Sequence, residues 1–360
     1  MFKKILITLF SLLIISCASV QTKDDKKSFQ KYWPKLPEMP RYKYMMTIYS
    51  SDDVVKKSDA QRMRESLVGR SQPQYVFKRP IDITVQNGMM YFLDSDKPMV
   101  NAFDFRRRTY FGFGYRREGK LSNPVSVAVD KKGFVYVADR GRKSVLVFDS
   151  FGLYSSTINM AAISAQISGL AIDDENGYLY VTDRGGIDTN LHQLFQYSLQ
   201  GELIRKIGTR GSKPLEFNLP LDVTVGSDGS VYVLDAGNFR VQKFDSEGNF
   251  VLSWGNVGDM LGQFGSPRSI AIDDEDNVYV SDAQFGNVQV FNAEGKLLMA
   301  LGGLSQDDFP GAFSLITGVT VDDKSHLYIL DQFLKKLEVY KIMDEKERSL
   351  VVENAKKLKQ

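Results

Sequence analysis

Short apolar runs separated by clusters of Gly, Asn, Asp and Glu make up most of the chain between residues 80 and 340. Residues 238–302 show the pattern most clearly, because four such runs follow one another there: SIAID, NVYVSD, VQVFN and KLLMALG. Short runs rich in Val, Ile, Tyr and Phe and bounded by turn residues are typical of β-strands. This stretch therefore predicts a four-stranded antiparallel sheet. Several runs are apolar at successive positions, which indicates that both faces of the sheet are covered.

A Tyr–aliphatic or aromatic–x–Asp motif recurs at the end of the second strand of each predicted sheet. The copies end at Asp94, Asp139, Asp183, Asp235, Asp282 and Asp331, at intervals of 45, 44, 52, 47 and 49 residues. A repeat of this length that contains four strands is typical of a propeller blade. The sequence therefore predicts an all-β fold, a six-bladed β-propeller of four-stranded antiparallel blades. An aspartate that every blade shares is expected to be structural, since a catalytic site needs asymmetry.

The sixth predicted blade lacks an outer strand, because the chain after Tyr340 becomes highly charged. Residues 41–50 (RYKYMMTIYS) form a predicted strand without a blade of its own. We expect this strand to pair with the last blade and close the ring, which leaves no open edge. The propeller is predicted over residues 41–343. It includes a helical insertion at 53–70 that is expected to pack over the ring, and residues 344–360 are predicted to form a charged helix or tail.

The first residues predict an export signal. Met1–Lys4 is basic, and Ile5–Ser16 is an apolar run of twelve residues. A membrane-spanning helix needs about twenty apolar residues, so residues 1–16 are predicted to be a signal peptide. The quartet Ile14-Ile15-Ser16-Cys17 resembles the bacterial lipobox, and this resemblance implies that Cys17 carries a lipid. The alternative is an ordinary signal peptide that happens to contain a cysteine.

Residues 17–40 are predicted to be a flexible, proline-containing tether, with Pro34, Pro37 and Pro40 at every third position. Ala18 and Ser19 follow Cys17 in place of an aspartate. In lipoproteins of this kind, that implies transport to the outer membrane. We therefore expect a protein anchored by lipid to the bacterial outer membrane, on its periplasmic or its cell-surface side.

Composition narrows the class of partner. The chain has 46 basic and 44 acidic residues, and the charges balance once Lys3 and Lys4 leave with the predicted signal. No overall field favours nucleic acid, so we expect no nucleic-acid partner. Cys17 is the single cysteine of the sequence, which excludes a disulfide framework and a thiolate metal cluster. We expect a monomer.

Two segments resemble the NHL repeat. One contains Gly262-Gln263-Phe264, Pro267, Ile270–Asp273, Val278–Asp282 and Val288–Phe291, and the other contains Asn238-x-Arg240-Val241-Gln242. The resemblance covers about residues 80 to 340 and implies a six-bladed propeller. Some family members bind RNA through a basic face, but here aspartates offset the local arginines. Related propellers with amidating-lyase activity hold zinc with three histidines, whereas this sequence contains two, His192 and His326.

Strand direction predicts which face of the ring carries the site. The connections between blades and the loops after the six repeated aspartates are expected to share one face. Asp82 and Asp222 lie at equivalent positions three blades apart, so they are expected to face each other across the channel mouth. Two carboxylates there could hold a cation or a polar ligand, calcium being the cofactor to consider, as in six-bladed lactonases. Alternatively, each carboxylate accepts hydrogen bonds from neighbouring loop amides.

The third predicted blade departs from the repeat by a longer loop after Asp183 on the same face. Such loops carry specificity when a rigid scaffold holds them. The candidate partner-binding residues are Arg184, Asp188, Asn190 and His192 in this loop, with Arg140, Arg142, Asn238, Arg240 and Gln284 around the rim.

The pattern favours a binding protein over an enzyme, because the sequence contains no nucleophile–base pair, metal triad or cofactor fingerprint. The hypothesis is a non-enzymatic, lipid-anchored scaffold that binds an envelope protein or another macromolecule. The alternative is a calcium-dependent hydrolase or lactonase centred on Asp82 and Asp222.

Overall fold

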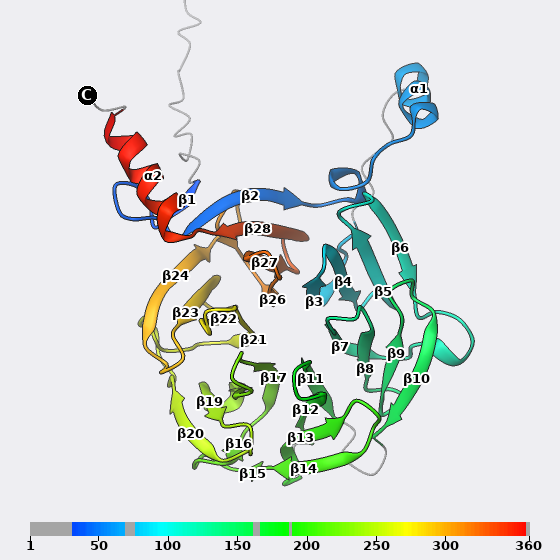
Figure 1. Cartoon of the computed structure of the whole chain (residues 1–360), viewed down its shortest axis with the longest axis vertical. Coiled ribbons are helices and arrows are strands. Elements are labelled where there is room, and N and C mark those ends of the chain that lie inside the picture. The colour runs from blue at the N-terminus through cyan, green and yellow to red at the C-terminus, as the bar shows by residue number, and fades with distance from the viewer. Residues whose placement is uncertain (1–30, 69–75, 161–165, 187–188, 358–360) are drawn as a thin grey trace, which may run out of the picture.

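The computed structural model describes residues 31–68, 76–160, 166–186 and 189–357. Six antiparallel sheets are arranged as blades around a central axis (Figure 1). The first three blades contain, from the axis outward, β3 (Pro80–Gln86), β4 (Met89–Asp94), β5 (Lys97–Asp104) and β6 (Thr109–Phe113); β7 (Pro124–Val129), β8 (Val135–Asp139), β9 (Ser144–Phe148) and β10 (Tyr154–Asn159); β11 (Ile167–Asp173), β12 (Tyr178–Arg184), β13 (His192–Ser198) and β14 (Leu203–Ile207).

The remaining blades follow the same order. They contain β17 (Pro220–Val225), β18 (Val231–Asp235), β19 (Arg240–Phe244) and β20 (Phe250–Trp254); β21 (Pro267–Ile272), β22 (Val278–Asp282), β23 (Asn287–Phe291) and β24 (Leu297–Leu304); β26 (Ile316–Val321), β27 (His326–Asp331) and β28 (Lys336–Ile342). Short parallel pairs brace two of the connections between blades: β15 (Thr209–Arg210) with β16 (Glu216–Phe217), and β24 with β25 (Ala312–Phe313). Three 3₁₀ turns complete the described loops: η1 (Ser51–Asp53), η2 (Arg117–Gly119) and η3 (Ala236–Asn238).

The core lies between the blades. All residues of β8, β9 and β22 are buried, and so is the tyrosine that opens the repeated motif in every blade. Each sheet is therefore covered on both faces, as the runs of successive apolar residues predict. The predicted six-bladed propeller is confirmed.

The sixth blade takes its outer strands from the N-terminal side of the chain. β2 (Tyr42–Ile48) pairs antiparallel with β28, and β1 (Tyr32–Trp33) pairs with β2. The Tyr42 hydroxyl donates to the Tyr279 hydroxyl of the fifth blade at 3.1 Å. The predicted closure of the ring by residues 41–50 is thus confirmed, and the outer edge of β28 is not left open.

A buried ion pair reinforces this closure. Lys336 and Glu338 are both fully buried on β28, with 2.5 Å between Nζ and Oε1. Lys336 also donates to Asp308, whose other carboxylate oxygen accepts from the Tyr49 hydroxyl just after β2. The other Glu338 oxygen accepts from the Gly311 amide. These bonds join β28 to the connection between the fifth and sixth blades and to the end of the closing strand.

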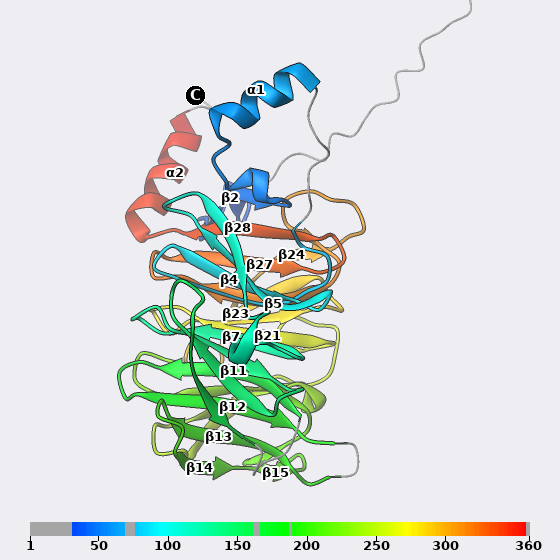
Figure 2. The ribbon, with the colours of Figure 1, turned by 90° about the vertical axis from the view of Figure 1, so that its right-hand side faces the viewer.

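The helical insertion differs from the prediction. α1 (Asp59–Val68) lies outside the ring and covers neither mouth of the channel (Figures 1 and 2). Met63 and Leu67 are 66% and 74% exposed, so the expectation that they pack over the propeller is wrong. The few apolar side chains of this short helix bury too little area to hold it against the blades. Lys57, just before the helix, instead forms ion pairs with Asp52 and Glu65.

α2 (Glu345–Lys357) follows β28 and also stands outside the ring (Figure 1). An ion pair between Lys341 and Glu347 and a hydrogen bond from Arg348 to the Met343 carbonyl attach its first turn to the sixth blade. Neither helix of the described ranges has the length and apolar run that a membrane span requires.

Candidate functional site

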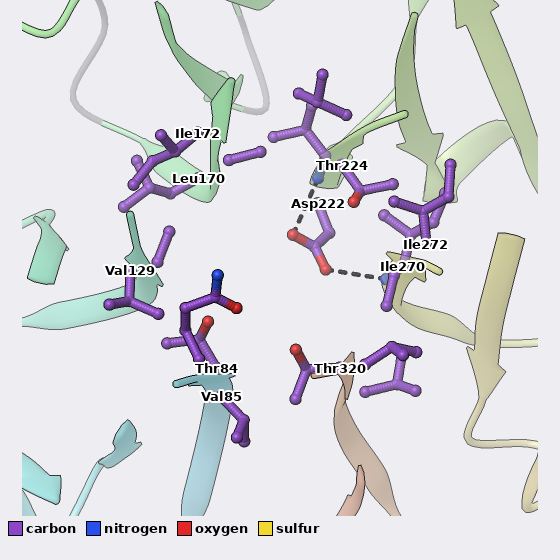
Figure 3. Close-up of a pocket in the computed structure, with 18 of the residues that line it drawn as sticks. Thr84, Val85, Val129, Leu170, Ile172, Asp222, Thr224, Ile270, Ile272 and Thr320 are labelled. Carbon is purple, nitrogen blue, oxygen red and sulfur yellow. Dashed lines mark hydrogen bonds between the residues drawn. The ribbon is translucent and has the colours of Figure 1, made fainter. Parts of the chain in front are cut away.

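The innermost strands β3, β7, β11, β17, β21 and β26 surround a channel of about 600 Å³. Its wall combines aliphatic side chains and threonines with carboxylates, those of Asp173, Asp174, Glu175, Asp273 and Asp274 among them. Figure 3 shows Thr84, Ile172, Asp222, Thr224 and Ile272 around the opening. The two ends of the ring are the connector face and the hairpin face. The connector face holds the connections between blades and the turns after the second strands. The hairpin face holds the turns between first and second strands and between third and fourth strands.

Six equivalent positions, one from each innermost strand, form the channel mouth on the connector face. In blade order they read Asp82, Ser126, Gly169, Asp222, Ser269 and Gly318, so the series Asp-Ser-Gly occurs twice around the ring. Asp82 and Asp222 both line the channel from blades three apart, as predicted.

Both aspartates join their own blade to the next. Asp82 accepts from the Ile83 amide at 2.9 Å and from the Val127 amide of the second blade at 2.8 Å. Asp222 accepts from the Val223 amide and, in the fifth blade, from the Ile270 amide, each at 2.9 Å. This arrangement fits the alternative in which each carboxylate accepts hydrogen bonds from neighbouring amides.

The serine and glycine positions fit the same scheme. The Ser269 hydroxyl donates to Asp222 at 2.9 Å and accepts from the Val319 amide of the sixth blade. A Cβ on Gly169 would lie 2.6 Å from the Asp222 Cα, so only glycine fits beside that aspartate. The two aspartates are therefore built into the joints between blades.

Burial raises the pKa of both channel-mouth aspartates above the ordinary carboxyl range, and the charge of Asp222 raises the pKa of Asp82 further. Both side chains keep part of their surface open to the channel. The amides that donate to them favour the ionised form, but they do not outweigh burial. Perturbed carboxyls in a cavity are typical of functional sites and also of structural networks.

The six repeated aspartates at the ends of the second strands are buried structural acceptors. Asp282 accepts from the amides of Gly265, Ser266 and Gln284. Asp139 accepts from the amides of Ser122 and Asn123 in the same way. In five blades the carboxylate fixes the connection that leads into its own blade, and Asp183 accepts from the Gly185 amide in the turn that follows it. These bonds agree with the structural role expected of a residue shared by all blades.

Most of the predicted rim residues are engaged within the protein. Arg140 donates to the Ile167 carbonyl, and Arg142 donates to the carbonyls of Glu118 and Lys120. Arg240 pairs with buried Asp235 at 2.9 Å and donates to loop carbonyls, and Asn238 donates to Gly211 and Asp235. These side chains stabilise connectors instead of standing free for a partner, because buried loop carbonyls need donors.

The third-blade loop is placed in part. His192 is 1% exposed, and its Nδ1 accepts from the Leu219 amide at 2.9 Å, so the expectation that it contacts a partner is wrong. Burial lowers the pKa of His192 and favours the neutral ring. Asn190 and Gln284 are exposed on the connector face, and Arg184 is half-buried. Asp188 and Cys17 lie outside the described residues.

The sequence reasoning missed the apolar side chains of the connectors. Val257, Met260, Leu261, Leu304 and Phe333 are 59% to 67% exposed, and all lie on connections or turns of the fourth to sixth blades. The sequence signal that could have revealed them is the presence of apolar residues in loops between predicted strands, because a loop residue need not be buried. Among the described residues, no group of three or more His, Cys, Asp or Glu is placed to hold a metal ion.

A family model described as the NHL repeat matches residues 121–148 and 217–244. These segments contain β7 to β9 and β16 to β19. The chain contains NHL repeats and folds as a six-bladed propeller. Over 75 residues it is 36% identical to NHL repeat-containing protein 3 of Homo sapiens, and over 120 residues it is 32% identical to the Mus musculus protein of that name. The matches cover 21% and 30% of this chain and 21% and 33% of those relatives, so this NHL chain matches a third or less of their length.

Solved structures share the fold. A protein of unknown function from Bacteroides thetaiotaomicron aligns with a TM-score of 0.59 at 17% identity, covering 82% of this NHL propeller and 75% of that chain. Virginiamycin B lyase from Staphylococcus aureus aligns with a TM-score of 0.51 at 10% identity, covering 74% and 96%. At these identities the likeness shows the fold alone.

Proposed function

We propose that this NHL propeller is a lipid-anchored envelope protein that binds a protein partner through its connector face. NHL propellers generally mediate protein–protein interaction, and the apolar side chains exposed on the connector face support that role here. Met260 and Leu261 are 67% and 62% exposed on one connection. Clustered apolar residues at a surface typically mark an interaction site.

The contrast between the two faces carries the proposal. The described hairpin face exposes mostly charged and polar turns, such as 106–108 and 131–132, with Phe151, Leu153, Tyr154 and Leu203 among its large exposed apolar residues. The connector face exposes apolar residues from several blades in succession. Because the blades themselves are rigid and closed, such loops can present a stable surface to a partner.

The anchor part of the proposal rests on residues 1–17 and their resemblance to a lipobox. Residues 17–31 would then link the lipid to β1, which pairs with β2 and buries Trp33, so this linker reaches at most about 50 Å when fully extended. This length lets the connector face meet a partner well away from the bilayer.

The second candidate function is a calcium-dependent hydrolase or lactonase at the channel mouth. It is favoured by the raised pKa of Asp82 and Asp222, which both line the central channel. Both carboxylates already accept hydrogen bonds from amides of adjacent blades, which favours the binding role over the catalytic one.

Chemical cross-linking of the full chain in intact envelopes, followed by affinity capture, tests the proposal. We compare Leu261→Asp on the connector face with Leu153→Asp, which is 66% exposed on the hairpin face. A charged carboxylate in an apolar contact is strongly unfavourable, so Leu261→Asp should lose the cross-linked partner while Leu153→Asp keeps it. Equal recovery by both variants would refute the assignment of the face.

A further inference from the structure

The connector face is divided into two halves of different chemistry. Over the first three blades it is basic, with exposed Arg79, Arg116, Lys120, Lys143 and Lys213 on its turns and connectors. Among the described turns and connectors of this half, the exposed carboxylates belong to Asp96 and Glu118, and Asp96 is paired with Lys78 at 2.9 Å. Most of the positive charge there is therefore uncompensated.

Over the fourth to sixth blades the same face is more apolar. Val257, Met260, Leu261, Leu304 and Phe333 are each more than half exposed, whereas the large apolar residues exposed on the basic half, Tyr115, Leu191, Leu215 and Leu219, are 43% to 49% exposed. The exposed charges of the apolar half are mixed in sign: Asp259, Arg268, Asp307, Asp308 and Lys335. The net charge of the molecule is close to zero, so the division arises from placement and not from composition.

We propose that the partner is a protein that presents an acidic patch beside an apolar segment, and that the two halves of the connector face bind these in one orientation. This inference rests on the proposed function and specifies its partner. Apolar burial would supply most of the affinity, and the basic half would steer and orient the approach. A face with separate basic and apolar halves is complementary to a partner whose acidic and apolar surfaces are also separate.

The layout fits a protein better than a bilayer or a nucleic acid. An anionic bilayer offers phosphate groups and acyl chains everywhere along its surface, so it gains nothing from the separation of basic and apolar residues to opposite sides of the ring. Nucleic acid would leave the apolar half without a counterpart, because its backbone is charged throughout.

Selection of peptides by the full chain tests the inference, with a displayed library of random linear peptides as the probe. Lys143→Glu/Lys213→Glu reverses two charges of the basic half. The matched control, Lys132→Glu/Lys296→Glu, reverses two exposed charges of the hairpin face. None of these four side chains belongs to the core, so all variants should fold, as melting curves would verify.

We expect the enriched peptides to contain Asp or Glu next to Leu, Phe or Trp. Binding of a selected peptide should weaken at least about tenfold in Lys143→Glu/Lys213→Glu, and should weaken in wild type as salt shortens the Debye length below about 8 Å. The hairpin-face control should bind within about twofold of wild type, since its charges lie on the opposite end of the ring.

Enriched peptides that are basic or uncharged would overturn the inference while leaving the proposed function intact, provided that Leu261→Asp still lost the envelope partner. Equal weakening by the two charge reversals would also overturn it. Stronger binding of anionic vesicles or RNA than of any selected peptide, abolished by Lys143→Glu/Lys213→Glu, would assign the basic half to that ligand instead. If Leu261→Asp kept the envelope partner and selected peptides alike, the proposed function itself would fail.

Discussion

Among single residues, the two channel-mouth aspartates depart from the symmetry of the blades for a structural reason. The series Asp-Ser-Gly repeats after three blades, and each aspartate accepts from the amides of the next blade. Glycine then follows where the backbone of the next aspartate leaves no space for a Cβ. Asp82 and Asp222 therefore act as joints between blades, and their raised pKa is a consequence of that location.

The raised pKa predicts a pH-dependent stability. A carboxyl whose pKa is higher in the folded than in the unfolded state stabilises the fold fully below its unfolded pKa of about 3.9. This stability is lost as the pH rises through the folded value, which is about 6 for Asp222 and about 7 for Asp82. The free energy of unfolding of wild type should fall between pH 5 and pH 8 by roughly 4 kcal/mol. In Asp222→Asn this fall should be smaller, because one titrating group is gone and Asp82 no longer faces its charge.

Urea denaturation at a series of pH values measures this effect. At pH 5 the variant should be less stable than wild type by about 1 kcal/mol, since the amide replaces an acceptor with a donor. An unchanged pH slope would contradict the assignment. Calcium added to the same samples tests the alternative function: a calcium-dependent rise in melting temperature that is lost in Asp222→Ala would favour the hydrolase.

Among the secondary-structure elements, the pairing of β2 with β28 closes the ring. β28 has no outer partner from its own segment of chain, and β2 supplies that partner from about three hundred residues earlier. The buried Lys336–Glu338 pair ties β28 to the neighbouring connection, while Tyr42 reaches the fifth blade. Closure therefore depends on side chains as well as on the strand ladder.

Lys336→Met should destabilise the protein strongly. Glu338 would remain fully buried with no counter-ion, and loss of one partner from a buried ion pair costs about 3–5 kcal/mol. Lys336→Met/Glu338→Gln should recover part of that loss, because the neutral amide needs no counter-ion. Chemical denaturation of wild type and both variants gives the comparison, and a double variant no more stable than the single one would contradict this role for the pair.

At the scale of the whole molecule, the two faces of the ring differ in the side chains that they expose. The first and last described elements, β1 and α2, both lie at the closing blade (Figure 1). The connector face carries the apolar and basic halves, whereas the hairpin face exposes mostly polar turns. One face is thus suited to a partner.

Cys17→Ser should move the protein from the membrane fraction to the soluble fraction. The thiol is the proposed point of lipid attachment, and two acyl-type anchors give stable membrane association. Fractionation with immunoblotting, together with the mass of the purified protein, measures the change. A variant that stays in the membrane fraction at unchanged mass would disprove the anchor, without bearing on the connector face.

The sequence by itself determined the number of blades, the strands of each blade and the closing strand. These follow from a repeat length and from apolar runs, which are local properties that each blade expresses by itself. Only the tertiary structure decided whether each candidate side chain is free to contact a partner or is hydrogen-bonded within the protein. Arg140 and His192 bond to backbone groups 27 residues away, and Asp222 bonds to an amide 48 residues away.

Such partners belong to neighbouring connectors and blades, so no local pattern reveals them. The same reason explains α1, because the helix was predictable from its own residues but its position outside the ring was not. It also explains the divided connector face, since lysines and apolar residues from separate loops form two halves only after the ring brings those loops together.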